Sequence, residues 1–133
     1  MENYKEALTI WESLNKEEQL FVTPNGLFVD SQRLICRFVH YEHNELAGFI
    51  DAYQLKKSRT AFLVVAVSEK YRRRGIAKSL MYKVEQELIR KNYHRIDYVV
   101  NKDNLPSISL ANSCNYNFLG EKKDKVVFIK YLR

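Results

Sequence analysis

The sequence is poor in the residues that build cross-linked, metal-binding or low-complexity proteins. Its 133 residues include only two cysteines, two prolines and four glycines. Cys36 and Cys114 form no CxxC pair, and the histidines at 40, 43 and 94 lack metal-ligand spacing with one another or with cysteine. A disulfide framework and a zinc site are therefore not expected, and we predict no bound metal. The two cysteines are expected to be reduced thiols.

Long apolar runs are absent as well. Charged residues interrupt residues 1–11, so this segment resembles neither a signal peptide nor a membrane span. With 46% hydrophobic residues the chain can bury a core of its own, and no repeat, low-complexity tract or linker divides it. We therefore expect one domain over residues 1–133, in a cytoplasmic protein that does not contact membranes.

Positive charge is concentrated in the second half of the sequence. The net charge is +6, but residues 1–66 hold seven Lys or Arg against nine Asp or Glu, whereas residues 67–133 hold fifteen against seven. The two halves thus carry −2 and +8. A basic half favours an anionic partner, either a nucleic acid or a phosphorylated cofactor, and charge alone does not decide between them.

Hydrophobic periodicity predicts a mixture of helices and strands. Apolar residues spaced by three or four predict helices at residues 4–20, at 76–90 and, more briefly, after Asn104. Segments rich in β-branched and aromatic residues predict strands at 34–41, 46–55, 60–67, 94–100, 116–120 and 126–132, with a charged connection at 121–125. The strand at 60–67 is apolar on both faces, as expected of a central strand covered on both sides. This order predicts an α/β fold (mixed α+β) with a mixed sheet.

One basic turn carries the strongest chemical signal. Residues 72–77 read Arg-Arg-Arg-Gly-Ile-Ala and join the apolar strand 60–67 to the helix 76–90. The first N–H groups of a helix have no acceptor within the helix, and its dipole places about half a positive charge there, so this turn forms a potential anion site. Gly75 lets a diphosphate approach the backbone because it has no Cβ, and Ala77 keeps its own position small.

The positive side chains of this turn support the same interpretation. Exposed cations at a helix N-terminus oppose the dipole at about 0.3–1 kcal/mol each, so the three arginines and Lys78 are poorly placed unless an anion binds among them. A solvated basic turn is the alternative interpretation. A P-loop and a dinucleotide fingerprint are excluded, since GxxxxGK[ST] and GxGxxG are both absent.

Residues 65–77 closely resemble the acetyl-CoA signature of the GNAT N-acetyltransferases, whose core Q/R-x-x-G-x-G/A follows a strand. Here the core reads Arg72-x-x-Gly75-x-Ala77. Residues 104–108 (Asn-Leu-Pro-Ser-Ile) and the later Asn115-Tyr116 are similar to a second segment of this family, N-x-x-[SA]-[IV] followed by G-F. The combination is specific, although each motif alone is less so. It implies a GNAT-like twisted mixed sheet with splayed central strands, flanked by helices.

The resemblance also implies a site for acetyl-CoA. The cofactor would lie in a V-shaped opening between the strands 60–67 and 94–100. Backbone groups of the first strand would pair with the pantetheine arm, N–H groups of the turn would bind the diphosphate, and the Asn104 side chain would bond the arm or act as a helix cap. The residues implied to bind the cofactor are Val65, Ala66, Val67, Arg72, Arg73, Arg74, Gly75, Ile76, Ala77, Lys78, Ser79 and Asn104.

The usual catalytic positions of the family are changed in this chain. Many members carry a Glu near the start of the central strand, where this chain has Ala61, and a Tyr seven residues after the Asn of the second segment, where it has Ala111. The family's Gly-Phe is replaced by Asn115-Tyr116. Because Asn is the commonest non-Gly residue with positive φ, we expect the turn itself to be retained.

Acetyl transfer to an amine needs a group or a water chain that removes the proton of the amine and a proton for the leaving thiolate. We predict Asp51 as the base, with Glu42 and His43 as alternatives. We predict Tyr116 as the acid, with Tyr98 as the alternative. A Cys-like thiol has a pKa of about 8.5, so loss of the acid would slow the transfer without abolishing it.

The sequence thus predicts an acetyl-CoA-dependent N-acetyltransferase that transfers the acetyl group directly to a primary amine of a small molecule or a peptide. The alternatives are a module that binds acetyl-CoA without catalysis and a basic nucleic-acid-binding domain; we expect no nucleic acid as partner. The acceptor would enter between the Glu-rich residues 2–18 and the charged hairpin around Lys122. Both a monomer and a homodimer are compatible with the sequence.

Overall fold

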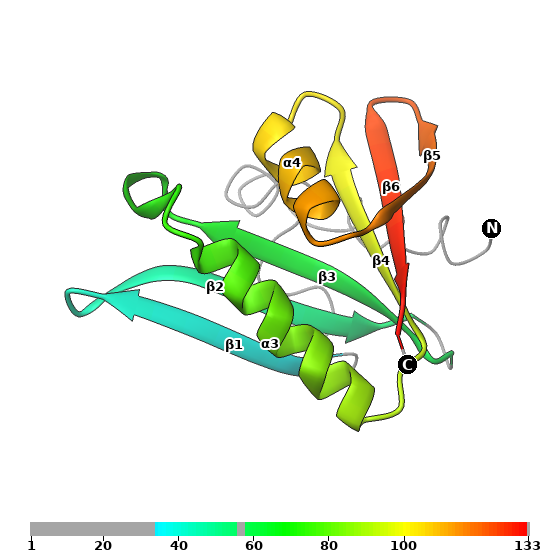
Figure 1. Cartoon of the computed structure of the whole chain (residues 1–133), viewed down its shortest axis with the longest axis horizontal. Coiled ribbons are helices and arrows are strands. Elements are labelled where there is room, and N and C mark those ends of the chain that lie inside the picture. The colour runs from blue at the N-terminus through cyan, green and yellow to red at the C-terminus, as the bar shows by residue number, and fades with distance from the viewer. Residues whose placement is uncertain (1–33, 56–57, 133) are drawn as a thin grey trace.

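The described part of the chain, residues 34–55 and 58–132 of a computed structural model, forms a six-stranded sheet with two helices (Figure 1). The helix predicted at 4–20 lies outside the described residues. In chain order the elements are β1 (Leu34–Glu42), β2 (Glu45–Gln54), β3 (Thr60–Val67), the 3₁₀ helix η2 (Glu69–Tyr71), α3 (Ile76–Arg90), β4 (Arg95–Asn101), α4 (Leu105–Ser113), β5 (Asn117–Lys122) and β6 (Lys125–Tyr131).

The strands are ordered β1-β2-β3-β4-β6-β5 across the sheet. β3 and β4 run parallel, and the other four neighbouring pairs are antiparallel. Parallel strands need a crossover connection, which α3 supplies between β3 and β4. The mixed α/β fold expected from the sequence is confirmed.

The two central strands are paired over only part of their length. Three register pairs join residues 60–62 of β3 to residues 95–97 of β4, and the pairing ends there. Beyond this point the strands diverge, as Figure 1 shows, so the facing backbone groups of residues 63–67 and 98–101 have no strand between them. The splayed opening implied by the sequence resemblance is therefore present.

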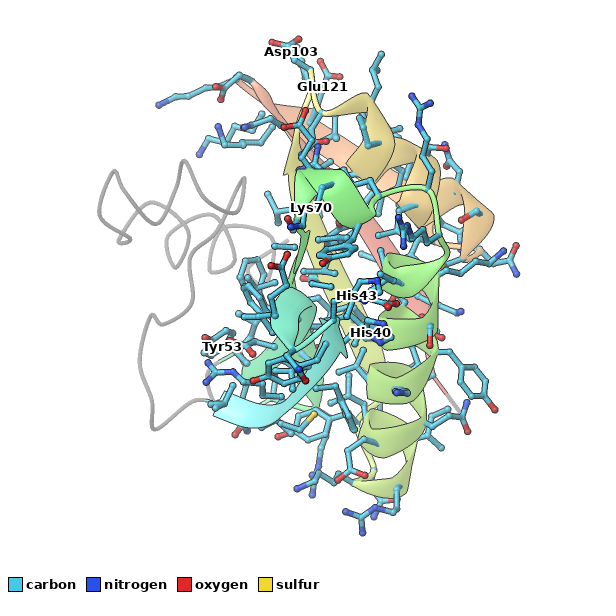
Figure 2. All side chains as sticks on the ribbon, turned by 90° about the vertical axis from the view of Figure 1, so that its left-hand side faces the viewer. His40, His43, Tyr53, Lys70, Asp103 and Glu121 are labelled. Atoms are coloured by element: carbon cyan, nitrogen blue, oxygen red, sulfur yellow. The ribbon has the colours of Figure 1, made fainter. Side chains whose placement is uncertain are left out.

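Apolar side chains cover both faces of the sheet. On one face α3 packs its buried stripe, Leu80, Met81, Val84 and Leu88, against the strands. Each such side chain contributes about 1.5–3 kcal/mol relative to exposure. The opposite face has its own core, to which Tyr53 belongs, and Figure 2 shows this side chain on the side away from α3. β3 supplies residues to both cores, as predicted for a central strand covered on both sides.

Most predicted bounds agree with the structure to within one or two residues, but the connection at 121–125 is shorter than predicted. β5 extends to Lys122 and β6 begins at Lys125, so only Lys123 and Asp124 form the turn. Lys123 has a φ of 56°, and Asn115, at the end of α4, has a φ of 67°. The expectation that Asn115 retains the turn is confirmed.

Candidate active site

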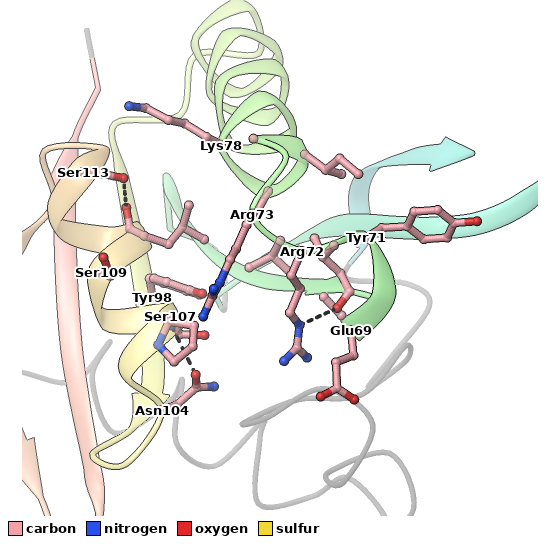
Figure 3. Close-up of a pocket in the computed structure, with 18 residues that line it drawn as sticks. Glu69, Tyr71, Arg72, Arg73, Lys78, Tyr98, Asn104, Ser107, Ser109 and Ser113 are labelled. Carbon is pink, nitrogen blue, oxygen red and sulfur yellow. Dashed lines mark hydrogen bonds between the residues drawn. The ribbon is translucent and has the colours of Figure 1, made fainter. Parts of the chain in front are cut away.

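A cavity of about 770 Å³ opens where β3 and β4 separate. Its walls are the end of β3, the turn from η2 into α3, Tyr98 of β4 and one side of α4 (Figure 3). The crossover places the first turns of both helices at this opening, so the positive ends of two helix dipoles face it. Among the lining side chains, three are cations (Arg72, Arg73 and Lys78) and one is a carboxylate, Glu69. The cavity is therefore electropositive.

Ten of the twelve residues implied to bind the cofactor line this cavity: Val65, Ala66, Val67, Arg72, Arg73, Gly75, Ile76, Ala77, Lys78 and Asn104. Two do not. The N–H of Ser79 donates to the Gly75 carbonyl at 3.0 Å as part of the helix. The guanidinium of Arg74 lies 5.4 Å from the centre of the Tyr71 ring. These two residues are not among those that line the cavity.

The turn before α3 has an unusual backbone. Arg73 and Gly75 both have positive φ, 65° and 77°. Left-handed residues in such a turn direct successive N–H groups to one side, which forms a concave anion-binding nest. The first turn of α3 contains no acidic residue that would compensate its dipole. A Cβ at Gly75 would meet no atom within 4 Å, so φ rather than space within the protein requires glycine there.

Of the two roles that the sequence left open for Asn104, the structure shows the helix cap. Its Oδ1 accepts a hydrogen bond from the Ser107 N–H at 3.2 Å, which makes it the N-cap of α4. It also lines the cavity. The cap thus holds the side chain at the edge of the opening, where a ligand can meet it.

Besides Tyr71, whose hydroxyl donates to Glu45 Oε1 at 2.8 Å, one further tyrosine lines the cavity, and it is Tyr98. It is the first residue of β4 beyond the pairing with β3, and it lines the cavity. Its side chain is buried, and burial raises the pKa of Tyr98 to about 12, whereas a hydrogen bond with Ser107 acts in the opposite direction. At neutral pH the phenol is therefore protonated and can donate a hydrogen bond to a ligand in the cavity.

Tyr116, predicted as the acid, does not line the cavity. Its hydroxyl donates to Glu85 Oε2 at 2.8 Å, and Lys130 Nζ donates to the other oxygen of this carboxylate at 3.0 Å. Lys130 also donates to the Cys114 carbonyl at 2.8 Å. Burial, followed by the charge of Glu85, raises the pKa of Tyr116 well above its ordinary value. This buried network joins α3 to β6 and to the end of α4.

Asp51, predicted as the base, does not line the cavity either. Arg37 lies directly opposite on β1 and donates Nε to Oδ1 at 2.6 Å and Nη2 to Oδ2 at 2.8 Å. The Tyr53 hydroxyl donates to Oδ2 at 2.9 Å. Three donors thus occupy a fully buried carboxylate. The geometry gives Asp51 a structural contact, not access to the opening.

The alternative bases lie on the β1–β2 hairpin and do not line the cavity. Glu42 Oε1 is 3.0 Å from His40 Nε2, and hydrogen bonding to His40 lowers the pKa of the Glu42 carboxyl. His43 occupies the turn with a φ of 50°. Ala61 and Ala111 are fully buried and offer no functional group.

One wall of the cavity is formed by α4, a role that the sequence did not predict. Pro106, Ser109, Leu110 and Ser113 recur at helical spacing and all line the opening. The signal was present as a period of three to four residues, but it mixes small, polar and apolar side chains. A search for apolar periodicity alone does not detect such a face.

Residues 34–55 and 58–132 contain no group of three or more His, Cys, Asp or Glu side chains that could hold a metal ion. No helix in this part of the chain is long and apolar enough to span a membrane.

A mixed sheet that splits beside a basic helix N-terminus is the architecture implied by the GNAT resemblance. The sequence matches the acetyltransferase (GNAT) family over residues 3–116. The chain therefore belongs to the GNAT acetyltransferase family. Among curated protein sequences, none matches it.

Solved structures with the same fold include several acetyltransferases. PaiA N-acetyltransferase of Thermoplasma acidophilum, in complex with coenzyme A, has a TM-score of 0.67 and 16% identity, over 74% of this chain and 61% of that chain. Ribosomal-protein-S18-alanine N-acetyltransferase of Escherichia coli has the same TM-score and identity, over 90% and 91%. YncA of Salmonella typhimurium, with its cofactor acetyl-CoA, has a TM-score of 0.70 and 15% identity, over 97% and 90%. At these identities the similarity establishes the fold.

Proposed function

We propose that this protein transfers the acetyl group of acetyl-CoA to a primary amine of a small molecule or of a peptide or protein, by direct transfer in a ternary complex. One observation carries the proposal: the cavity at the strand split is bordered by a backbone nest, two helix N-termini and three cations. The solved relatives that hold coenzyme A or acetyl-CoA support the donor. The relative that acts on a ribosomal protein supports a protein amine as one class of acceptor.

The pantetheine arm and the diphosphate of acetyl-CoA suit different parts of the cavity. The end of β3 at residues 65–67, which lies beyond the pairing with β4 and lines the cavity, suits the amides of the pantetheine arm, which would pair with it as an additional strand would. The nest at residues 73–77 suits the diphosphate, since it combines oriented N–H groups with the dipole of α3. Arg72, whose Nε donates to the Val67 carbonyl at 3.1 Å, ties this turn to the end of β3. This hydrogen bond helps to fix the position of the turn relative to the end of β3.

The reaction itself exchanges one bond for another. The amine nitrogen attacks the thioester carbon, a C–N bond forms, the C–S bond breaks and coenzyme A leaves as a thiolate. The thiol has a pKa of about 8.5, so full proton transfer from Tyr98, at about 12, is unfavourable by about 5 kcal/mol. We therefore assign Tyr98 the role of a hydrogen-bond donor to the developing negative charge. The thiolate takes its proton from solvent.

Removal of the proton from the acceptor amine is assigned to water. Asp51 is held by Arg37 and Tyr53, and Glu69 is the one carboxylate among the lining residues. Glu69 belongs to η2, beside the proposed diphosphate site rather than at Tyr98. A water chain in the open cavity remains as the route for this proton.

A module that binds acetyl-CoA without turnover is the second candidate, because Ala61 and Ala111 carry no functional group where relatives carry a base and an acid. Calorimetry with acetyl-CoA, followed by thiol release with amines, polyamines and N-terminal peptides, separates the two. Binding with release for at least one acceptor class is the expected result. Binding without release across the panel would favour the module, and absence of binding would refute both.

Gly75→Glu is the matched control for binding. The substitution adds a carboxylate at the proposed diphosphate site, where the protein itself leaves space for it. We expect acetyl-CoA to raise the thermal midpoint of the wild type and to leave that of Gly75→Glu nearly unchanged. A shift of equal size in both proteins would contradict the assignment of this turn.

A further inference from the structure

The strand β4 presents its side chains to both faces of the sheet beyond the point where its pairing with β3 ends. Tyr98 and Val100 belong to the core that α3 covers, and Val99 belongs to the core on the opposite face. Because side chains alternate along a strand, Asn101, the last residue of β4, lies on the same face as Val99. It does not line the cavity proposed for the donor. Asn101 is thus at the strand split, but on the side away from the helices.

The Asn101 side chain carries a buried oxygen that has no donor. Within residues 34–55 and 58–132, Oδ1 of Asn101 is shielded from solvent and has no hydrogen-bond partner. The backbone carbonyl of the same residue, in contrast, accepts from the Asn104 N–H at 3.0 Å. A buried polar atom without a partner lowers stability, and native proteins contain few of them. The Oδ1 atom therefore supports no contact of the described fold.

The cations beside Asn101 do not supply the missing donor. Lys125 lies directly opposite it on β6, and its Nζ pairs with Asp124 Oδ1 at 2.7 Å. Lys102, the next residue of the chain, pairs with Glu121 Oε1 at 3.1 Å. Both ammonium groups thus have carboxylate partners, and the Asn101 oxygen is left to a donor from outside the protein.

We infer that Asn101 Oδ1 binds an N–H group of the acceptor amine. The inference rests on the proposed function. Direct transfer brings the amine to the thioester while the donor fills the helix side of the split, so the opposite side is the direction of approach for the amine. An amine or ammonium carries the donors that a carbonyl oxygen requires, whereas the phosphates of the donor carry acceptors. The residue as a whole is partly exposed, and the soft χ2 torsion of asparagine lets the oxygen turn toward an incoming group.

Two substitutions of Asn101 separate its oxygen from its volume. Asn101→Leu removes the oxygen at similar volume, and we expect it to raise the KM for the acceptor about 10- to 100-fold, the range of a hydrogen bond to a charged group, with kcat within about threefold. Asn101→Asp keeps an oxygen at the same position and should keep the KM within about threefold. Asn112→Leu makes the same change at an exposed position of α4 outside the cavity, so it is the matched control and should leave the KM unchanged.

Thiol release at saturating acetyl-CoA, with spermidine and with a peptide that begins with alanine, measures KM and kcat. Calorimetry measures the Kd for acetyl-CoA, which should be the same in the wild type and in every variant because Asn101 lies outside the donor cavity. Urea denaturation gives a readout that needs no acceptor. The unfolding free energy of Asn101→Leu should equal or exceed that of the wild type, because the substitution removes an unsatisfied buried oxygen.

Three results would overturn the inference while leaving the proposed function intact. They are a wild-type KM in Asn101→Leu, a rise in its Kd for acetyl-CoA equal to the rise in KM, or a lower unfolding free energy, which would show that the oxygen has a structural partner. Absence of acetyl-CoA binding by the wild type, or absence of thiol release with every acceptor, would refute the proposed function instead.

Discussion

Two buried tyrosines allow a sharp test of which hydroxyl belongs to the chemistry. Tyr98→Phe and Tyr116→Phe each remove one oxygen atom and keep the aromatic ring. The rings contact each other in a T-shaped, edge-to-face arrangement with centroids 6.2 Å apart, so both substitutions occur in the same packing environment. Only the hydroxyls differ in their partners. The structure therefore predicts opposite phenotypes for nearly identical changes.

The Tyr116 hydroxyl contributes to stability. It donates at 2.8 Å to the carboxylate of Glu85, a residue that is 8% exposed. Its removal leaves Glu85 with the Lys130 contact and one oxygen without its donor. Hydrogen bonds to charged groups are worth about 1.5–3 kcal/mol, and in a domain of this size each kcal/mol shifts the thermal midpoint by about 3–4 °C. Tyr116→Phe should lower the midpoint by about 5–10 °C and leave the kcat of the folded enzyme within about threefold.

The Tyr98 hydroxyl faces the cavity, and its loss should affect the rate. A preorganised donor to a developing oxyanion is worth about 100- to 1000-fold in kcat, and because a thiolate is less basic we expect a smaller loss for Tyr98→Phe, about 10- to 100-fold. The free energy of unfolding should fall by no more than about 1 kcal/mol, the value of one hydrogen bond with the neutral Ser107.

Urea denaturation measures the first quantity, and thiol release at saturating acetyl-CoA and acceptor measures the second. Both variants should bind acetyl-CoA in calorimetry, which verifies that the folded site is retained. The reasoning fails if Tyr116→Phe loses kcat at unchanged stability while Tyr98→Phe keeps it. That outcome would return the acid role to Tyr116, as the sequence predicts.

Three further predictions follow from the same contacts. Gly75→Ala should cost about 1–2 kcal/mol of unfolding free energy in urea because φ is 77° while its Cβ meets nothing within 4 Å, and Gly75→Asn should cost less; equal costs would contradict a conformational origin. Asp51→Asn should lower the unfolding free energy by about 2–4 kcal/mol, since Arg37 loses its counter-charge, while kcat changes little; a large loss of kcat alone would restore Asp51 as the base. Burial raises the pKa of Cys36 from its ordinary 9.0 to about 11 and that of Tyr98 from its ordinary 10.0 to about 12. Both groups therefore ionise at lower pH in the unfolded chain, so the unfolding free energy should fall as pH rises from about 9 to about 12, and it should fall less steeply in Tyr98→Phe. A rise in the unfolding free energy over this range would refute these shifts.

Secondary structure and the basic turn before α3 could be predicted from the sequence because both depend on short-range physics. The bounds of β3 and α3 agree with those predicted from apolar periodicity, and Gly75 occupies the cap position that its lack of a Cβ favours. The cap at Asn104 also follows from a local preference, since its side chain bonds an N–H only three residues away. Local preferences of this kind can be recognised from the sequence alone.

The assignment of individual side chains required the tertiary structure. Asp51 is a plausible base in the sequence, but the register of β1 against β2 places Arg37 opposite it. The sequence does not distinguish Tyr98 from Tyr116. In the structure Tyr98 lies beside the cavity because the β3–β4 pairing ends before it, whereas the Tyr116 hydroxyl is bound to Glu85. Register and crossover geometry arise from contacts between distant residues, which no local pattern encodes.

The basic turn at residues 72–77 shows which properties follow from the sequence and which depend on the tertiary structure. Composition and motif determined that residues 72–77 form a positively charged turn before a helix, with one glycine that permits a left-handed backbone. The fold alone decided that Arg73 enters the cavity while Arg74 lies over Tyr71, because a positive φ at Arg73 and a hairpin about thirty residues earlier in the chain set their directions. The positive charge of the turn follows from its residue types, whereas the direction in which each charged side chain points depends on the backbone conformation and on the elements packed around it.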